Sequence, residues 1–517
     1  MKLSLQSLQA LAAKGYLVPA FDVEAVRAET RRAPRWIHFG AGNIFRAFPA
    51  VLVQKLIDAG TINSGLCVAE CYDEEIIDKG FSHFDNLTAA VSLRHDGTVE
   101  KRVVGSIAEA LAYGRDTARI GEIMTADSLQ IVSMTITEKG YAVRDPGAET
   151  IGAPVTIIAR LCKLLHARFQ AGAKPVAMVS LDNCSHNGDL LKAGILSVAE
   201  SWRRSGAVSA EFLSYLNNPA LVSFTWSMID KITPRPSEDV LQMLRADGLE
   251  GMEVAETAKH TFVSAMVNAE ECEYLAIEDH FPNGRPPLEK AGVLFGSRET
   301  VDKIEKMKVC TCLNPLHTAL AVFGCLLGYT KISEEMKDDT LVRMIRTIGY
   351  TEGMPVAADP GVMSAEAFIG EVLTKRLPNP FVPDTPQRIA CDTSKKLPVR
   401  FGETLKTYVQ RGKTDLSFLT MIPMVFAGYA RYLTGVGDDG KPFALSPDPN
   451  LAELQPVVAG FELGKPFESS QLRPLFSNPE FFGVNLYDHA LGRKTEGFFA
   501  EMNEGPGAIR RTIEKYL

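Results

Sequence analysis

Short apolar runs alternate with helical patterns along the first half of the chain. Four short runs are strand candidates: Arg35–Phe39, Gly65–Cys71, Leu129–Thr137 and Pro175–Leu181. The last two are apolar and rich in valine and isoleucine, which is typical of buried parallel strands. Between the last two, Thr156–Gln170 carries apolar residues at the spacing of one helix face. Strands that alternate with helices predict an α/β domain with a mainly parallel, doubly wound sheet.

The pattern changes near residue 285, where Phe281–Pro287 is dense in proline and glycine. Beyond this loop helical spacing dominates. The predicted helices are Pro315–Tyr329, Glu334–Gly349, Ala365–Lys375 and Asp415–Leu433, and the proline-rich connectors are Leu377–Pro386 and Pro442–Pro456. We therefore predict an α/β domain over residues 1–285 and a mainly α-helical domain over residues 286–517.

Length and charge narrow the function. The 517 residues are too many for one compact core, which agrees with two domains. A net charge of −8 argues against a nucleic-acid partner, because phosphate contacts need a basic face, but it allows a small anionic substrate in a local basic pocket. No apolar run reaches the roughly 18 residues of a membrane span. Nine cysteines without a disulfide framework or zinc spacing predict a cytoplasmic protein without a metal site.

A glycine turn follows the first predicted strand. Gly40 and Gly42 are separated by one residue, and such a turn lets backbone N–H groups approach a pyrophosphate at the start of a helix. Glu70 ends the second predicted strand, where a carboxylate binds a ribose and repels a 2′-phosphate, which favours NAD over NADP. Phe45 replaces the third glycine, and Pro49 predicts that the helix proper starts late. These residues alone fit either a dinucleotide site or a plain tight turn.

The segment KVCTCLNPLH, from Lys308 to His317, contains a second candidate site. Asn314 before Pro315 predicts an N-cap followed by proline at the first helical position, and His317 then shares a helix face with Asn314. A neutral lysine at 308 can act as general base for alcohol oxidation, and an asparagine amide can polarise a carbonyl oxygen. A helix cap, a surface lysine and a core histidine would explain the same residues.

Further polar clusters interrupt apolar segments. They contain Glu138, Asp182 with Asn183, Asp230 with Lys231, and Arg388 with Lys396. The clusters that follow predicted strands lie where open α/β sheets bind ligands. Each cluster taken alone is typical of a cap, a turn or a solvated charge.

Taken together and in order, these segments resemble one family. The motifs are GAGNIFRAF, TITEKGY, SLDNCSHNG, MIDKITP, IEDHFPNGRP, KVCTCLNPLH and DTPQRIACDTSKKLP. They resemble the polyol-specific long-chain dehydrogenases, which include mannitol 2-dehydrogenase, fructuronate reductase, tagaturonate reductase and mannitol-1-phosphate dehydrogenase. This resemblance covers about residues 30–400. It implies an N-terminal Rossmann domain, a helical C-terminal domain, a site in the cleft between them, a monomer, and NAD or NADP chemistry without a metal.

The resemblance also implies roles for single residues. Lys308 is the expected base, and its expected catalytic companions are Asn314, His317 and Asn183, the last polarising the substrate oxygen. The expected substrate contacts are Asp230, Arg388 and Lys396. The expected cofactor contacts are Gly40, Gly42, Asn43, Ile44, Arg46, Glu70 and Glu138.

Two positions depart from the family pattern. The chain has K-x5-N-x2-H, one residue longer than the family's K-x4-N-x2-H. In a continuous helix that residue would rotate Lys308 by about 100°, whereas a loop before Pro315 would absorb it. Lys231 replaces the arginine of the usual D-R-I-T-P form. The role of Lys308 therefore depends on how the backbone absorbs the additional residue.

The resemblance implies an NAD-dependent oxidoreductase acting on a small sugar acid or polyol, with interconversion of D-fructuronate and D-mannonate as the favoured reaction. The alternatives are a mannitol 2-dehydrogenase, another polyol or ketose enzyme (D-tagaturonate, arabinitol), and an NAD-binding regulator without turnover. A zinc alcohol dehydrogenase would need clusters of cysteine and histidine. A short-chain dehydrogenase would need Tyr-x-x-x-Lys, which Tyr141, Tyr274 and Tyr329 do not provide.

Overall fold

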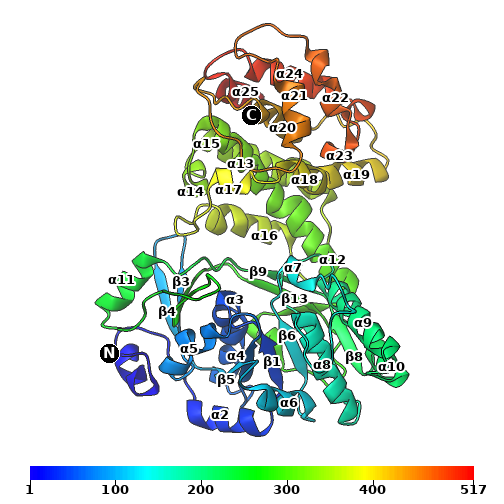
Figure 1. The fold of residues 1–517 in the computed structure, drawn as a ribbon. Coiled ribbons are helices and arrows are strands. Elements are labelled where there is room, and N and C mark those ends of the chain that lie inside the picture. Colours follow the sequence, from blue (N-terminus) through cyan, green and yellow to red (C-terminus); the bar gives the residue numbers. More distant parts are fainter. The chain divides into compact units, whose positions relative to one another are not determined.

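The computed structural model describes residues 1–517 and divides them into two compact units, Met1–Asp302 and Lys303–Leu517 (Figure 1). The division falls inside helix α12 (Arg298–Met307), later than the loop at which the sequence places it. That loop lies within the first unit, where the Arg285 guanidinium pairs with Asp279 and Glu289.

A six-stranded parallel sheet forms the centre of the first unit. Its strand order is β5-β2-β1-β6-β7-β8, so the order reverses beside β1. The strands are β1 (Trp36–Phe39), β2 (Leu66–Glu70), β5 (Ile107–Ala112), β6 (Ile131–Met134), β7 (Val176–Ser180) and β8 (Val222–Thr225). The predicted doubly wound sheet is confirmed, and the four predicted strands are β1, β2, β6 and β7.

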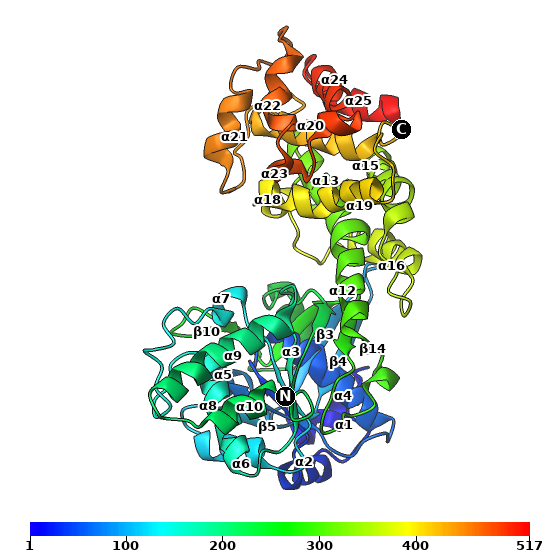
Figure 2. The same cartoon turned by 90° about the vertical axis from the view of Figure 1, so that its right-hand side faces the viewer.

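Helices lie on both faces of this sheet (Figure 2). Two hydrophobic clusters of buried residues form the core on its two faces. Along β1, Trp36 packs into one cluster, and Ile37 and Phe39 pack into the other. The helices of this unit are α1 (Leu8–Ala12), α2 (Val23–Arg32), α3 (Asn43–Ala47), α4 (Pro49–Asp58), α5 (Glu75–Gly80), α6 (Thr117–Thr125), α7 (Glu138–Tyr141), α8 (Ile157–Gln170), α9 (Asn187–Arg204), α10 (Ala210–Asn217) and α11 (Glu238–Ala246).

Three small sheets complete the first unit. Their strand orders are β12-β3-β4, β14-β13-β9 and β10-β11. The strands are β3 (Thr88–Leu93), β4 (Val99–Val104), β9 (Ser227–Asp230), β10 (Ala255–Glu256), β11 (Phe262–Val263), β12 (Met266–Glu270), β13 (Tyr274–Glu278) and β14 (Leu294–Gly296). The antiparallel pair β9 and β13 fixes the position of Asp230 at the end of β9.

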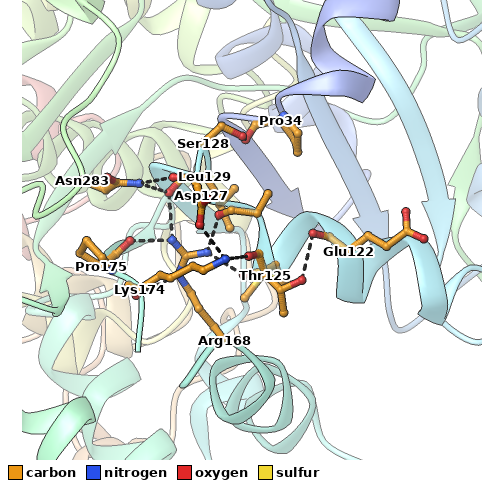
Figure 3. Close-up of polar contacts among 12 residues, drawn as sticks. Pro34, Glu122, Thr125, Asp127, Ser128, Leu129, Arg168, Lys174, Pro175 and Asn283 are labelled. Atoms are coloured by element: carbon orange, nitrogen blue, oxygen red, sulfur yellow. Dashed lines mark hydrogen bonds and ion pairs between the residues drawn. The ribbon is translucent and has the colours of Figure 1, made fainter. Parts of the chain in front are cut away.

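The guanidinium of Arg168, on α8, is buried and holds together the loops that lead into β6 and β7 (Figure 3). It donates to five backbone carbonyls, those of Met124, Ala126, Leu129, Lys174 and Pro175. The side-chain amide of Asn283 donates to the carbonyls of Asp127 and Leu129 beside it. One arginine therefore satisfies carbonyls of two loops that bring the central strands into register.

The second unit is helical, as predicted, and two buried helices form its core. Every residue of α20 and all but three of α13 are buried, and the two helices pack together where Gly428 lies against Phe323. The helices after α12 are α13 (Asn314–Leu327), α14 (Ile332–Glu335), α15 (Asp339–Arg346), α16 (Ala365–Glu371), α17 (Pro386–Ile389), α18 (Thr393–Leu397), α19 (Glu403–Gln410), α20 (Met421–Leu433), α21 (Leu451–Val458), α22 (Arg473–Phe476), α23 (Pro479–Phe482), α24 (Gly492–Met502) and α25 (Ala508–Tyr516).

One helical stretch, Arg298–Leu327, is long and apolar enough to cross a membrane by length and composition. Of its most apolar window, 78% is buried inside the protein. Such burial is typical of the core helix of a globular domain.

Three predicted helical boundaries are wrong. Asp338 accepts hydrogen bonds from the N–H groups of Thr340 and Leu341, so a new helix starts there and interrupts the predicted helix Glu334–Gly349. The helix predicted from Asp415 begins only at Met421, where the Glu352 carboxylate caps its amino end. The connector Pro442–Pro456 ends in α21, which contains Pro456.

We expect Arg168→Met to lower the free energy of unfolding of the first unit by about 3 kcal/mol or more, because five backbone carbonyls, two of them in fully buried hydrogen bonds, lose a charged donor. All three tryptophans, Trp36, Trp202 and Trp226, lie in this unit, so tryptophan fluorescence during urea unfolding reports on it alone. Arg203→Met, at an exposed position of α9, is the matched control and should change stability by less than about 0.5 kcal/mol. Equal losses in the two variants would contradict the role of Arg168.

Candidate functional site

Gly40 and Gly42 form the turn that follows β1. Gly40 has a φ of +111°, which favours glycine, and a Cβ there would lie 2.7 Å from the Thr135 hydroxyl. A Cβ at Gly42 would meet no heavy atom within 4 Å, so the backbone is open to close approach by a ligand. The short helix α3 follows, and α4 begins at Pro49, which agrees with the predicted late start. This turn fits the pyrophosphate of a dinucleotide.

The Glu70 carboxylate joins this turn to the end of β2. Its Oε2 accepts from the N–H of Ala41 at 2.8 Å, and its Oε1 accepts from those of Tyr72 and Asp73 at 2.8 and 3.2 Å. Glu70 is buried, so much of its hydrogen-bonding capacity is used within the protein. Fixing the turn is a role that the sequence did not reveal, and contact with a ribose stays a prediction.

Arg46 lies in the interior of the first unit. Its guanidinium donates to the Oδ1 of Asn43 at 2.9 Å and to the carbonyl of Ser264 at 2.5 Å, and burial lowers its pKa to about 10. The Asn43 amide donates to the Pro234 carbonyl at 3.3 Å, and Ile44 is half-buried against the hydrophobic cluster. These three residues connect the glycine turn to the rest of the unit, and their contact with a cofactor stays a prediction.

Glu138 and Asn183 lie after β6 and β7, at the carboxyl edge of the sheet. Both are exposed, and the Asn183 side chain makes no hydrogen bond in the structure. Beside Asn183, the Tyr141 hydroxyl donates to the carboxylate of Asp182, whose pKa is raised by burial, and it is hydrogen-bonded to the Ser180 hydroxyl at 2.9 Å. This buried network holds the turn that presents the Asn183 amide.

Asp230 ends β9 and is buried. The neighbouring Lys231 ammonium donates to the Glu270 carbonyl at 3.0 Å and pairs with Glu273 at 2.8 Å, and Glu273 also pairs with Lys55 at 2.8 Å. Lys231 therefore belongs to an internal ion-pair network, although the family pattern has arginine there. Contact of Asp230 with a substrate stays a prediction.

The Lys308–His317 segment is an interrupted helix. Lys308–Cys312 forms a π turn, and the N–H of Leu313 donates to the carbonyl of Lys308, five residues earlier, at 3.1 Å. Because a π turn closes its hydrogen bond one residue later than an α turn, it absorbs one additional residue without shifting the helix on either side. The predicted loop is therefore wrong, and the additional residue of the K-x5-N-x2-H motif lies in a π turn.

Asn314 is the first residue of α13, and Leu313, with a φ of −125°, is its N-cap. The N-cap predicted at Asn314 is therefore wrong, and Pro315 lies one position further into the helix. The Asn314 carbonyl accepts hydrogen bonds from Thr318 and Arg400. Its side-chain amide makes no hydrogen bond in the structure and is available to a ligand.

His317 is three residues further along the same helix. Its Nε2 is buried, lies 3.3 Å from the Asp384 carboxylate and makes no hydrogen bond. Burial, together with nearby positive charges, lowers the pKa of the imidazole to about 3. His317 is therefore neutral at physiological pH, and its Nε2 is an unsatisfied polar atom inside the candidate site.

Positive side chains surround this imidazole. In order of their effect on its pKa they are Arg400, Arg388, Lys396 and Arg376. Arg388, on α17, pairs with Asp384, and the Lys396 ammonium, on α18, donates to the Ile389 carbonyl at 2.8 Å. Burial lowers the pKa of Lys396, and it lowers that of Arg400 to about 10.

Asp384 and Arg400 were not predicted as site residues from the sequence. Arg400 follows Lys396 by four residues, which is the spacing of one helix face, and that spacing is the signal that could have found it. Asp384 lies in the proline-rich connector before α17, where its sequence context gives no such signal. The structure therefore brings three predicted residues, His317, Arg388 and Lys396, together with two that were missed.

Comparison with known proteins agrees with this geometry. Residues 34–290 match the model of the mannitol dehydrogenase Rossmann domain, and residues 300–465 match that of the mannitol dehydrogenase C-terminal domain. A D-mannonate oxidoreductase of Thermotoga maritima is 46% identical over 97% of this chain and 96% of its own. The chain belongs to the mannitol dehydrogenase family. The resemblance seen in the sequence is confirmed, and the protein is an oxidoreductase.

Solved structures have the same fold. A D-sorbitol dehydrogenase in substrate-free form superposes with a TM-score of 0.81 at 24% identity, over 98% of this chain and all of its own. A Pseudomonas fluorescens mannitol 2-dehydrogenase, in a ternary complex with NAD and D-mannitol, gives 0.70 at 25% identity, over all of this chain and 99% of its own. These likenesses agree with a Rossmann domain followed by a helical domain.

We expect stability to depend on pH through His317. Its pKa is about 3 when folded and about 6.5 when unfolded, so the unfolded state binds the proton first as the pH falls. The stabilisation is present above pH 6.5 and is lost toward pH 3. Between pH 7.5 and pH 5 the free energy of unfolding should fall by about 2 kcal/mol through His317. The His317→Gln variant should not show this part of the pH dependence. Urea unfolding followed by circular dichroism measures both proteins, and an identical pH dependence would contradict a neutral His317.

Proposed function

We propose that this protein is an NAD-dependent oxidoreductase that interconverts D-fructuronate and D-mannonate. The observation that carries the proposal is the 46% identity, over nearly the whole length of both chains, with a D-mannonate oxidoreductase. The open glycine turn, and the NAD bound in the complex of the related mannitol 2-dehydrogenase, support NAD as the cofactor. Family likeness and nine cysteines that form no disulfide support a monomeric, cytoplasmic, metal-independent enzyme.

The charges around His317 support a sugar acid as substrate. Four cations affect this neutral imidazole, and Asp384 is the carboxylate in contact with it. The Arg388 side chain is 62% exposed, so its guanidinium is accessible to a ligand. A carboxylate would offset this positive charge and accept a bidentate hydrogen bond from an arginine.

Different side chains are proposed to polarise the substrate carbonyl, transfer the proton and bind the substrate. Bound NADH would supply the hydride for reduction. The amides of Asn183 and Asn314, which make no hydrogen bond in the structure, are the proposed donors to the carbonyl oxygen, where they would stabilise the developing alkoxide. The Lys308 ammonium delivers the proton to that oxygen, and in the oxidative direction the neutral amine accepts it. Arg388 and Lys396 hold the carboxylate, and Asp230 holds a distal hydroxyl.

Substrate choice separates the proposal from its alternative. D-Fructuronate, D-tagaturonate and D-fructose are offered in parallel to the purified enzyme with NADH, whose absorbance is followed. We expect kcat/KM for D-fructuronate to exceed that for D-fructose by at least about 100-fold, because the neutral ketose leaves the cationic cluster unpaired. The mannitol 2-dehydrogenase among the structural relatives makes preference for D-fructose the competing outcome, which would refute the sugar-acid assignment.

Lys308→Ala tests the proposed base. We expect kcat on D-fructuronate to fall by about 100- to 10,000-fold, because the proton transfer loses its general acid. The Kd of NADH, measured by fluorescence, should stay within about twofold, since the glycine turn lies on the other unit. Lys395→Ala removes an exposed ammonium on α18 and should leave kcat unchanged. A Lys308→Ala enzyme with wild-type kcat would remove this lysine from the mechanism.

A further inference from the structure

In the π turn that contains Lys308, one backbone carbonyl cannot accept the hydrogen bond from five residues later that is typical of a π turn. The residue five positions after Cys310 is Pro315, which has no N–H, so Cys310 has no π-type donor. The hydroxyl of Thr404 instead donates to the Cys310 carbonyl at 3.0 Å, and Thr404 is buried. A side chain of another helix thus satisfies this carbonyl of the turn.

The first residue of α13, just after the turn, is held in the same way. The Arg400 guanidinium donates to the Asn314 carbonyl at 3.3 Å and to the Thr318 hydroxyl, which itself donates to the Asn314 carbonyl at 2.9 Å. Arg400 belongs to a second π segment, Pro398–Gly402, which packs against the first. The Asn314 carbonyl therefore accepts from two donors, next to the side-chain amide that is proposed to contact the substrate oxygen.

The two contacts have matching spacing. Arg400 and Thr404 are four residues apart and lie on one face of a continuous helical stretch, and the carbonyls of Cys310 and Asn314 are also four residues apart. The pair therefore contacts this segment at two points, Cys310 in the middle of the π turn and Asn314 at the start of α13. We call these two side chains, Arg400 and Thr404, the clamp.

We propose that the clamp is a positioning device for the reaction, which fixes the rotation of the π turn and thereby the directions of the Lys308 and Asn314 side chains. This inference rests on the proposed function. One residue of helical rotation changes a side-chain direction by about 100°, so relaxation of the π turn would move the ammonium away from the reacting oxygen. Arg400 and Thr404 act through Lys308 and Asn314 and need not touch the substrate.

Packing alone does not explain an arginine at position 400. Burial lowers its pKa to about 10, which shows that the charge is held at a desolvation cost. A methionine of similar length would fill the space without that cost. The guanidinium, with its several fixed donors, can contact the Asn314 carbonyl and the Thr318 hydroxyl at once.

The full-length variants Arg400→Met and Thr404→Val test the clamp. We expect kcat on D-fructuronate to fall by about 10- to 100-fold, while KM and the Kd of NADH change by less than about twofold. Arg400→Lys should recover part of kcat. In the Lys308→Ala background, Arg400→Met should have little further effect on kcat, because its effect passes mainly through the missing lysine. Unchanged kcat, or full additivity with Lys308→Ala, would overturn the proposal.

A second readout needs no turnover. Reductive methylation with ¹³C labels the lysines, and Lys308→Arg identifies the Lys308 signal in the NMR spectrum. We expect Arg400→Met and Thr404→Val to shift that signal and to leave the Lys395 signal in place. A shifted signal in an enzyme inactive on D-fructuronate would refute the proposed substrate and support the clamp. An unmoved Lys308 signal would overturn the clamp, whichever substrate the wild-type enzyme uses.

Discussion

The geometry of the helical unit depends on one steric conflict, between the ring of Pro315 and the carbonyl of Thr311 one turn earlier. In a regular α-helix these two groups collide, and the proline also lacks the N–H that the turn requires. The stretch Arg298–Leu327 avoids the conflict by widening into the π turn Lys308–Cys312 and by the non-helical φ of −125° at Leu313. The additional residue of the K-x5-N-x2-H motif is thus accommodated at the point where Pro315 already prevents an α-helical hydrogen bond.

The surrounding helices share this departure from regular geometry. Three more π segments occur in the same unit, Thr347–Gly353, Val372–Arg376 and Pro398–Gly402, and the first and last of them pack against the Lys308 turn. Close approach is possible because Gly353 has no side chain, since a Cβ there would lie 3.0 Å from the Thr311 methyl group. π turns are rare and are frequent at functional sites. Their concentration here agrees with a site whose side-chain directions are fixed by backbone distortion.

The sequence predicted what depends on periodicity and composition. Buried strands such as β1 and β7 are short apolar runs, and α8 is bounded by the cap of Thr156, so both kinds of element follow from local pattern. The π turn was not predictable, because the apolar spacing on either side of it is normal. The bonds of Glu70 and Arg46 were also hidden, since their partners come from segments far away in the sequence or from backbone N–H groups.

The neutral state of His317 decides which residue of the motif can carry a proton. Burial and the positive charge of Arg400, Arg388, Lys396 and Arg376 oppose protonation of the imidazole, so it cannot deliver a proton to an alkoxide at neutral pH. The Asn314 amide does not titrate, and the arginines hold their protons too tightly to release them. Lys308 is then the group of the motif suited to proton transfer. Two of these cations, Arg388 and Lys396, are also the proposed ligands of the substrate carboxylate, so the same side chains are proposed to bind the substrate and to keep His317 neutral.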